Sequence, residues 1–345
     1  MAIVRVTFTC LLLVWSSAWA FGQATEKVAV TFDELYDEPY SINKLFVAFQ
    51  PLYGEIFATN VNAGFGAEAQ YFHKNKFNIK GQFRKSYSSK FLDFNRENAL
   101  RNSTVANAPE VFNYYEFGGT FHIKDFDETS TAKIFLHQKK IPRSKWASTV
   151  ATYAEVPSKL RKIYGARLGT VIWDATTDIN RTLAKQGLTY ANLVNSDGNS
   201  LPETYVDGNG ETQDMQAFSN LYATNVYVGT SLTWIRNIAV SFDQYDDAVD
   251  DGIFNVYLDL LFAPSIKLDP VTYNGFDYST DAIKLNKIGV RAGFEGKYNR
   301  TLGWSYGGEL GYRPSLDGRG FFAVFKIAFP VFSSNLDNKV EAFQK

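Results

Sequence analysis

The chain has 345 residues, of which 35 are Lys or Arg and 36 are Asp or Glu, so its formal net charge is −1. This balance argues against nucleic acid as a partner, because a nucleic-acid-binding surface needs an excess of basic residues. Phe, Tyr and Trp make up 16% of the residues, and the length suits two ordinary soluble domains or one large all-β domain.

Residues 1–24 have the composition of a secretory signal peptide. Arg5 supplies a positive start, an apolar run follows to Trp15, and the small-x-small pattern that ends at Ala20 predicts a cleavage site, with Ala24 as a second choice. An uncleaved membrane anchor is disfavoured because the apolar run is too short to span a bilayer. Cys10 is the single cysteine and lies in this run, so the mature chain is expected to lack disulfides and thiol chemistry.

Apolar and polar side chains alternate strictly near the C-terminus. In residues 289–297, Val290 and Phe294 share one side and Arg291 and Glu295 share the other. The alternation resumes in residues 302–313 after the short segment "YNRT". Because a strand points successive side chains to opposite faces, the pattern predicts two half-apolar strands joined by a turn.

The same alternation recurs along the chain and predicts about 12 strands, with 10–14 as the expected range. The predicted strands are 44–53, 64–72, 77–87, 114–124, 132–137, 161–172, 225–234, 237–242, 254–262, 289–297, 302–313 and 320–332. Two connections, 88–112 and 178–219, are longer than ordinary turns. Counting 12 strands places the 178–219 connection at the same end as the short turns, which conflicts with strict up-and-down order.

A closed antiparallel transmembrane β-barrel explains this pattern better than a soluble β-sandwich, which also alternates. Aromatic residues gather near strand ends, many strands have about 10 residues, and the polar faces carry long charged side chains mixed with glycine. After residue 24 no apolar run is long enough for a transmembrane helix, so any crossing is made by strands.

The segments "NAGFGAEAQYFHKNKFNIKGQFRKSY" (62–87) and "GVRAGFEGKYNRTLGWSYGGELGYR" (289–313) resemble hairpins of bacterial outer-membrane β-barrel proteins, with a Bacteroidota-like "GQA" at the end of the signal. The resemblance implies an outer-membrane location and four regions: a signal peptide at 1–24, a periplasmic segment at 25–43, a barrel at 44–332 and a polar tail at 333–345. Such barrels usually end on an aromatic residue, whereas here Phe332 is followed by that tail.

The polar faces of the predicted strands give the candidate residues of the lumen. These candidates are Lys80, Arg84, Glu116, His122, Lys133, His137, Arg167, Asp259, Arg291, Glu295, Glu309, Arg313 and Lys326. Lys124, Arg161 and Lys297 extend the cationic set on the same parity, and Glu68 extends the acidic set. Such a lumen either selects anions by its positive charge or is closed by ion pairs between neighbouring strands.

No catalytic, cofactor or metal site is predicted. The sequence contains no Gly-x-Ser-x-Gly motif, and neither His122 nor His137 has an evident serine partner. If their strands pair, these two histidines come together, but no carboxylates lie at metal-ligand spacing. The acidic segments 207–214 and 243–251 match calcium loops only in part and are more typical of solvated hairpin loops.

These observations predict an outer-membrane barrel, without enzymatic activity, that acts as a passive pore for small, anionic solutes. The alternative is a non-conducting barrel whose loops bind a protein partner or belong to a secretion or surface assembly. In both cases the outer wall contacts membrane lipid.

Overall fold

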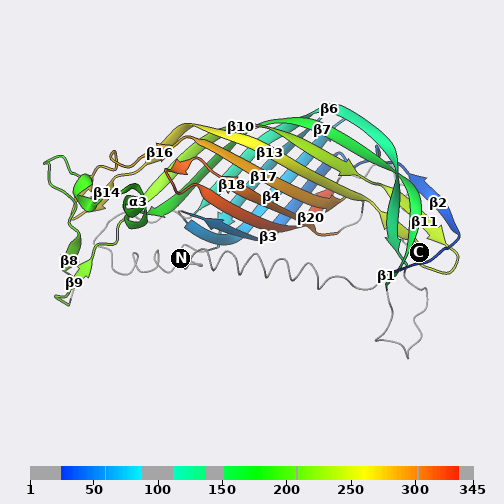
Figure 1. The fold of residues 1–345 in the computed structure, drawn as a ribbon, viewed down its shortest axis with the longest axis horizontal. Helices are drawn as coiled ribbons and strands as arrows, with labels where there is room; N and C mark the ends of the chain where they lie inside the picture. Colours follow the sequence, from blue (N-terminus) through cyan, green and yellow to red (C-terminus); the bar gives the residue numbers. More distant parts are fainter. Residues whose placement is uncertain are drawn as a thin grey trace.

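Ten antiparallel strands close into a barrel in the computed structural model, which describes residues 25–58, 60–87, 112–136, 151–206, 209–300 and 303–333. Each strand pairs with the next one along the chain, and the last pairs with the first (Figure 1). The strands are β3 (Leu45–Phe57), β4 (Asn60–His73), β5 (Phe77–Ser86), β6 (Asn113–Phe135), β7 (Ala151–Asp178), β10 (Phe218–Ile235), β13 (Gly252–Leu268), β17 (Ile288–Tyr298), β18 (Ser305–Tyr312) and β20 (Phe321–Ser333). The predicted fold class is therefore confirmed.

The number of barrel strands is ten rather than about 12, and two predicted strands account for the difference. Residues 132–137 belong mainly to the end of the long strand β6, which the sequence analysis divided in two. Residues 237–242 fall mainly in β11 (Ile238–Phe242), which pairs with β2 (Phe32–Asp37) and β12 (Ala248–Asp250) outside the barrel. Both segments alternate because they pack against protein on one face, as barrel strands do against lipid.

The two ends of the barrel differ in their connections. At the end where β3 begins and β20 finishes, here called the termini end, β4 and β5 are joined by residues 74–76 alone. The opposite end, here called the loop end, carries the connection at 179–217. The predicted position of that connection among the short turns is wrong, because dividing β6 into two strands added one strand before it and shifted the count by one.

The loop-end connections contain short elements of their own. They are α3 (Ile179–Gln186), η1 (Tyr190–Asn192), β8 (Thr204–Val206), β9 (Thr212–Asp214), β14 (Val271–Tyr273), β15 (Phe276–Tyr278), β16 (Leu285–Asn286) and β19 (Ser315–Leu316). Helix α3 begins after Asp178, whose side chain accepts a hydrogen bond from the Arg181 amide, and ends at Gly187 in the left-handed conformation. In the described part of the chain, no helix combines the length and apolar character needed to cross a membrane.

Strands β6 and β7 continue past the termini end and form a separate small unit. There, β1 (Thr25–Lys27) pairs in parallel with β7, and the β2–β11–β12 sheet packs on the hairpin (Figure 1). The buried core of this termini-end module comprises Ala132, Ile134, Leu136, Ala154, Val156, Ile238, Val240 and Phe242. The predicted periplasmic segment 25–43 supplies β1 and β2, whereas the signal peptide and all but the first residue of the polar tail lie outside the described residues.

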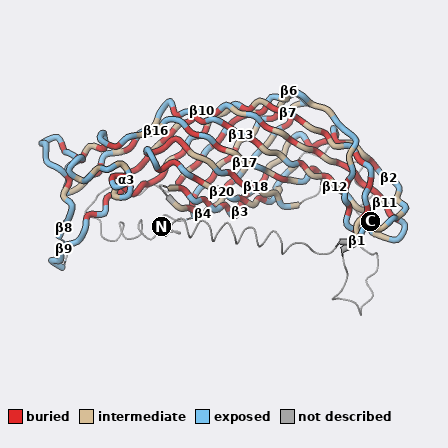
Figure 2. The backbone as a smooth tube through the Cα atoms, viewed as in Figure 1, coloured by how far each residue is buried: buried red, intermediate tan, exposed pale blue. Residues whose placement is uncertain are grey.

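The barrel is apolar outside and polar inside. Phe117, Leu168 and Leu260 are 60% or more exposed on its wall, whereas Arg84 and Arg291 inside are at most 1% exposed. Figure 2 shows buried and exposed residues alternating along the strands. This inversion is the arrangement of a barrel whose outer solvent is lipid.

Aromatic rings form a band on the outer wall near the termini end. Trp234, Phe254, Phe294 and Tyr306 follow one another across β10, β13, β17 and β18, with ring centroids 5.8, 6.4 and 6.5 Å apart. Trp304 extends the band at 5.5 Å from Tyr306. Aromatic side chains favour the interface between hydrocarbon and water, so this band marks one edge of the membrane.

Glycines let a large ring lie across the inner wall. A Cβ atom on Gly118 would come within 2.0 Å of the Tyr227 hydroxyl, and one on Gly169 within 2.5 Å. These positions lie side by side on β6 and β7. The buried ring of Tyr227 thus occupies the space that two side chains would fill.

We expect Gly118→Ala to lower the free energy of unfolding by about 1–3 kcal/mol, because the added methyl overpacks the wall beneath Tyr227. Urea unfolding from lipid vesicles, followed by tryptophan fluorescence, measures the change. Gly54→Ala is the matched control, since no atom lies within 4 Å of its new Cβ. Adding Tyr227→Phe should recover part of the loss; equal effects of the two alanines would contradict the packing argument.

Candidate functional site

Two arginines share one carboxylate at the centre of the lumen. Asp259 accepts hydrogen bonds from Arg167 Nε at 2.8 Å and Nη2 at 3.2 Å, and from Arg291 Nε at 2.8 Å. Arg291 also donates to Glu116, with Nη2 at 2.5 Å from Oε1. All four side chains are buried, so each charge depends on the others for compensation.

The strand register explains how Arg167 reaches Asp259. Asp259 on β13 is directly opposite Arg291 on β17, but Arg167 is two strands away on β7. The intervening residue on β10 is Gly229, which pairs with both. A Cβ there would lie 2.1 Å from Asp259 Oδ1, so only glycine leaves room for this ion pair.

A second group of arginines lies around the ring of Tyr114. The Arg84 guanidinium carbon is 3.9 Å from the ring centroid and that of Arg313 is 5.4 Å from it. Arg84 pairs with Glu309 at 3.3 Å, and Arg313 pairs with Glu55 at 2.7 Å. Cation–π contacts and ion pairs together fill this part of the lumen with side chains.

A third group contains lysines. Lys326 Nζ lies 2.7 Å from Glu68 and 2.8 Å from Glu295. Lys80 also pairs with Glu295, although β5 and β17 are five strands apart in a ring of ten. Lys297 differs from both, because it hydrogen-bonds Gln70 and lies on aromatic rings.

The loop end is closed by an apolar core. Trp173, which lies on the inner side of β7, contacts Phe57 edge-on, with ring centroids 5.2 Å apart. Ile179 and Leu183 of α3 belong to the same buried cluster, as does Leu316. The connections at this end therefore fold into a plug that continues the barrel interior.

The termini end is closed by residues 38–44, here called the strap. Ile42 packs on the inward-facing Phe72, Ile163, Ile235 and Ile253. Asparagine side chains fasten the strap from two connections between strands. Asn299 Nδ2 donates to Ser41 O at 2.8 Å, and Asn237 Nδ2 donates to Glu38 O at 2.8 Å.

The strap continues from β2, which is held against the hairpin of the termini-end module. Asp37 accepts a hydrogen bond from the Lys159 amide at 2.7 Å. Burial raises the pKa of the Asp37 carboxyl, while this amide, the Lys159 charge and Arg236 oppose the rise. The strap is therefore attached at one side to the barrel and at the other to the termini-end module.

A small cavity remains between the lysine group and the apolar layer at Ile163 and Ile253. Its volume is about 70 Å³, enough for a few water molecules. Charged lining residues are Glu68, Lys80, Arg167, Glu295, Lys297 and Lys326.

Most of the predicted lumen residues do lie inside the barrel. They are Lys80, Arg84, Glu116, Arg167, Asp259, Arg291, Glu295, Glu309, Arg313 and Lys326. His122 lies at the termini-end rim, with Nδ1 3.2 Å from Asn75 O and Nε2 3.3 Å from the Asn78 amide nitrogen. His137 lies outside the described residues, so its proximity to His122 stays a prediction.

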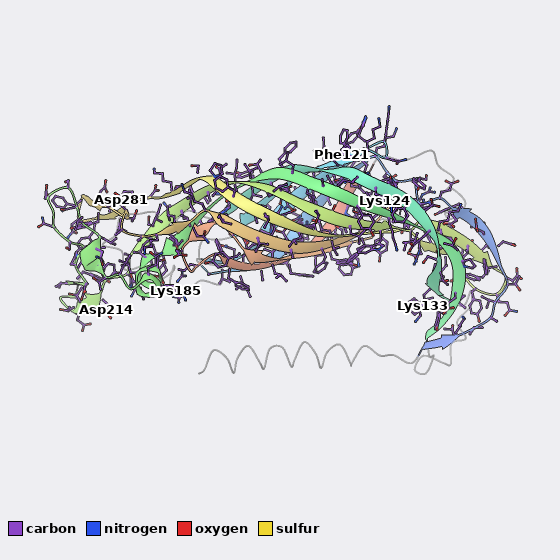
Figure 3. The ribbon with its side chains drawn as sticks, turned by 45° about the horizontal axis from the view of Figure 1, so that its top comes forward. Phe121, Lys124, Lys133, Lys185, Asp214 and Asp281 are labelled. Carbon is purple, nitrogen blue, oxygen red and sulfur yellow. The ribbon has the colours of Figure 1, made fainter. Side chains whose placement is uncertain are left out.

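The prediction that Lys133 and Lys124 face the lumen is wrong. Lys133 is exposed on the hairpin of the termini-end module, where its ammonium lies 4.0 Å from the Tyr153 ring centroid (Figure 3). Lys124 is exposed because the register of β6 shifts between His122 and Lys124, which reverses the parity of the strand (Figure 3). After this bulge the inward residue is Asp125, which pairs with Arg161 at 2.5 Å.

Sequence reasoning missed Glu55 for a similar reason. The register of β3 against β4 shifts between Gln50 and Tyr53, so Tyr53 and Glu55 face inward beyond the shift. The predicted strand stopped at residue 53 and left Glu55 unassigned. Within the described residues, no group of three or more His, Cys, Asp or Glu side chains is arranged to hold a metal ion.

The fold and its inverted surface define the class: a closed, antiparallel, ten-stranded transmembrane β-barrel. No family model matches the chain, and no curated protein does. Among solved structures, a match is OmpT with loop L8 deleted, an outer membrane protein of Vibrio cholerae. It is 10% identical over 84% of this chain and 99% of that one, with a TM-score of 0.17, so it carries no argument about function.

We expect Glu55→Gln to destabilise the folded barrel by about 3–5 kcal/mol, because it leaves the buried Arg313 without its anion. The control, Glu155→Gln, breaks an exposed pair with Lys27 and should leave the free energy of unfolding nearly unchanged, because solvent screens that pair. Urea titration in lipid vesicles compares the two variants. A small effect of Glu55→Gln would mean that Arg313 does not need this carboxylate.

Proposed function

We propose that the chain is a non-conducting outer-membrane barrel that anchors the termini-end module, and that this module binds a periplasmic protein. The observation that carries the proposal is the filled lumen: ion pairs join strands across it, and a core or strap closes each end. An eight-stranded barrel is already filled by side chains, and ten strands add little width.

The outer wall supports a membrane location through its apolar side chains and its aromatic band. The first barrel strand, β3, begins at the termini end and the last one, β20, finishes there. The connection at 179–217 lies at the opposite end. Outer-membrane barrels place short turns in the periplasm and longer loops outside the cell, so the module is assigned to the periplasm.

The termini-end module supports the binding half of the proposal. It has its own buried core, and its strands lie beyond the segment that the bilayer needs, since about 9–11 residues suffice to cross and β7 has 28. Leu35 and Val249 are 46% and 39% exposed on β2 and β12. Apolar side chains exposed on a periplasmic sheet are suited to contact another protein.

A passive pore for small anionic solutes is the second candidate. The cationic side chains of the lumen and the cavity beside Lys297 favour it, because an electropositive passage concentrates anions. In this alternative the strap withdraws and the ion pairs rearrange. Neither candidate assigns an enzymatic role to the chain.

In planar bilayers, we expect neither the full mature chain nor a variant lacking residues 25–43 to conduct, because the ion pairs and the loop-end core still fill the lumen. Heat-modifiable migration in gels verifies that both are folded. Steady conductance steps from either protein would contradict the proposal and favour the pore, and charge reversal at Arg291 would then test its ion selectivity.

A photo-crosslinking amino acid at Leu35 or Val249 should yield an adduct of one defined mass in cells. The same amino acid at Leu260, on the lipid-facing wall, is the matched control and should yield none. Replacing the exposed Asp33 and Glu34 by Lys should reduce the adduct at Leu35 if the partner is recognised in this region. Adducts equally frequent at Leu260 would contradict a specific binding face.

A further inference from the structure

Charges in the described lumen are balanced except in one place. Arg84, Arg161, Arg167, Arg291 and Arg313 are matched by Glu309, Asp125, Asp259, Glu116 and Glu55. The lysine group has three cations, Lys80, Lys297 and Lys326, but only two carboxylates, Glu68 and Glu295. One positive charge is therefore in excess beside the cavity.

The excess charge is located at Lys297. Both carboxylates are hydrogen-bonded to Lys326, and Lys80 also pairs with Glu295. Among the described residues no carboxylate lies within 4.0 Å of Lys297 Nζ; its partner is the Gln70 amide oxygen. The ammonium also lies 4.3 Å from the Phe46 ring centroid and 5.3 Å from that of Phe72.

These contacts do not replace a counter-charge. A cation–π contact is weak and a neutral acceptor carries no charge, so neither compensates the positive charge of this half-buried ammonium. The lining of the cavity adds the Thr120 hydroxyl and the Asn255 side-chain amide, which can donate hydrogen bonds, whereas the hydroxyls of Thr233 and Ser305 already donate to Asn255 Oδ1 and Ala328 O. The site is therefore one negative charge short of balance, and it has room and hydrogen-bond donors for an anion.

The size of the cavity limits what it can hold. At about 70 Å³ it accommodates a monatomic anion with one or two waters. The nearby Glu68 and Glu295 disfavour a second negative charge, so a monovalent ion fits better than a divalent one.

We propose that this cavity is a binding site for a halide-sized monovalent anion, held by the Lys297 ammonium. The ion neutralises the excess charge between the lysine group and the strap. The anion site does not depend on whether the barrel conducts, because its lining residues come together in the closed form of the barrel. Its test is an equilibrium binding measurement and is separate from the conductance test.

The test compares the thermal unfolding of the purified, detergent-folded barrel in sodium bromide and in sodium gluconate at equal ionic strength. In the wild type, the midpoint temperature should rise with bromide and then saturate, because a ligand that binds only the folded state stabilises it by mass action. Crystals grown with bromide should show an anomalous peak in the cavity in contact with Lys297 Nζ.

Lys297→Met removes the charge and keeps an unbranched side chain between the two Phe rings, so its midpoint should not depend on bromide. Lys185→Met is the matched control, because Lys185 is exposed at the loop end (Figure 3), and it should respond as the wild type does. An equal bromide response in Lys297→Met would overturn the proposal. The proposal would also be overturned if the wild-type midpoint showed no saturable response to bromide, or if the anomalous peak lay only outside the cavity. These two measurements use the wild type and remain valid even if Lys297→Met fails to fold.

Discussion

The structure depends on one electrostatic constraint: a charged side chain that points into a narrow barrel must find its counter-charge on another strand. Asp259 meets this need twice, since Arg167 and Arg291 both donate to it from different strands. The pair Lys80–Glu295 extends the same principle across the whole ring. Removing one member of a pair leaves the other charge without a partner in a low-dielectric interior. These pairs therefore fix the relative positions of β-strands that share no backbone hydrogen bond.

Small residues make this network possible. Gly229 leaves the gap through which Arg167 reaches Asp259, and Gly118 and Gly169 leave the surface on which Tyr227 lies. The rings of Tyr114 and Tyr227 then separate the arginines and contact their guanidinium faces. Glycine, tyrosine and arginine therefore act together, and the lumen resembles a polar protein core more than a channel wall.

The same closure affects what the barrel can do. Its loop end is sealed by a core that includes part of α3, and its termini end is sealed by Ile42. The strap that carries Ile42 leads directly into β2 of the termini-end module. A movement of that module would therefore be transmitted to the strap, and so to the termini end of the lumen, through the polypeptide chain itself. This connection relates the binding proposal to the pore alternative.

The sequence by itself determined the architecture, because the two-residue period of a strand is a local property. The inward set of residues 77–87 and 289–313 follows from it directly. Only the tertiary structure decided which protein or lipid surface covers each apolar face. Residues 132–136 and 238–242 alternate like barrel strands but pack on each other, while bulges at Lys124 and before Glu55 reverse parity without a sequence signal. Strand number, the strap and the unbalanced charge of Lys297 all depend on contacts between distant residues, which no local pattern encodes.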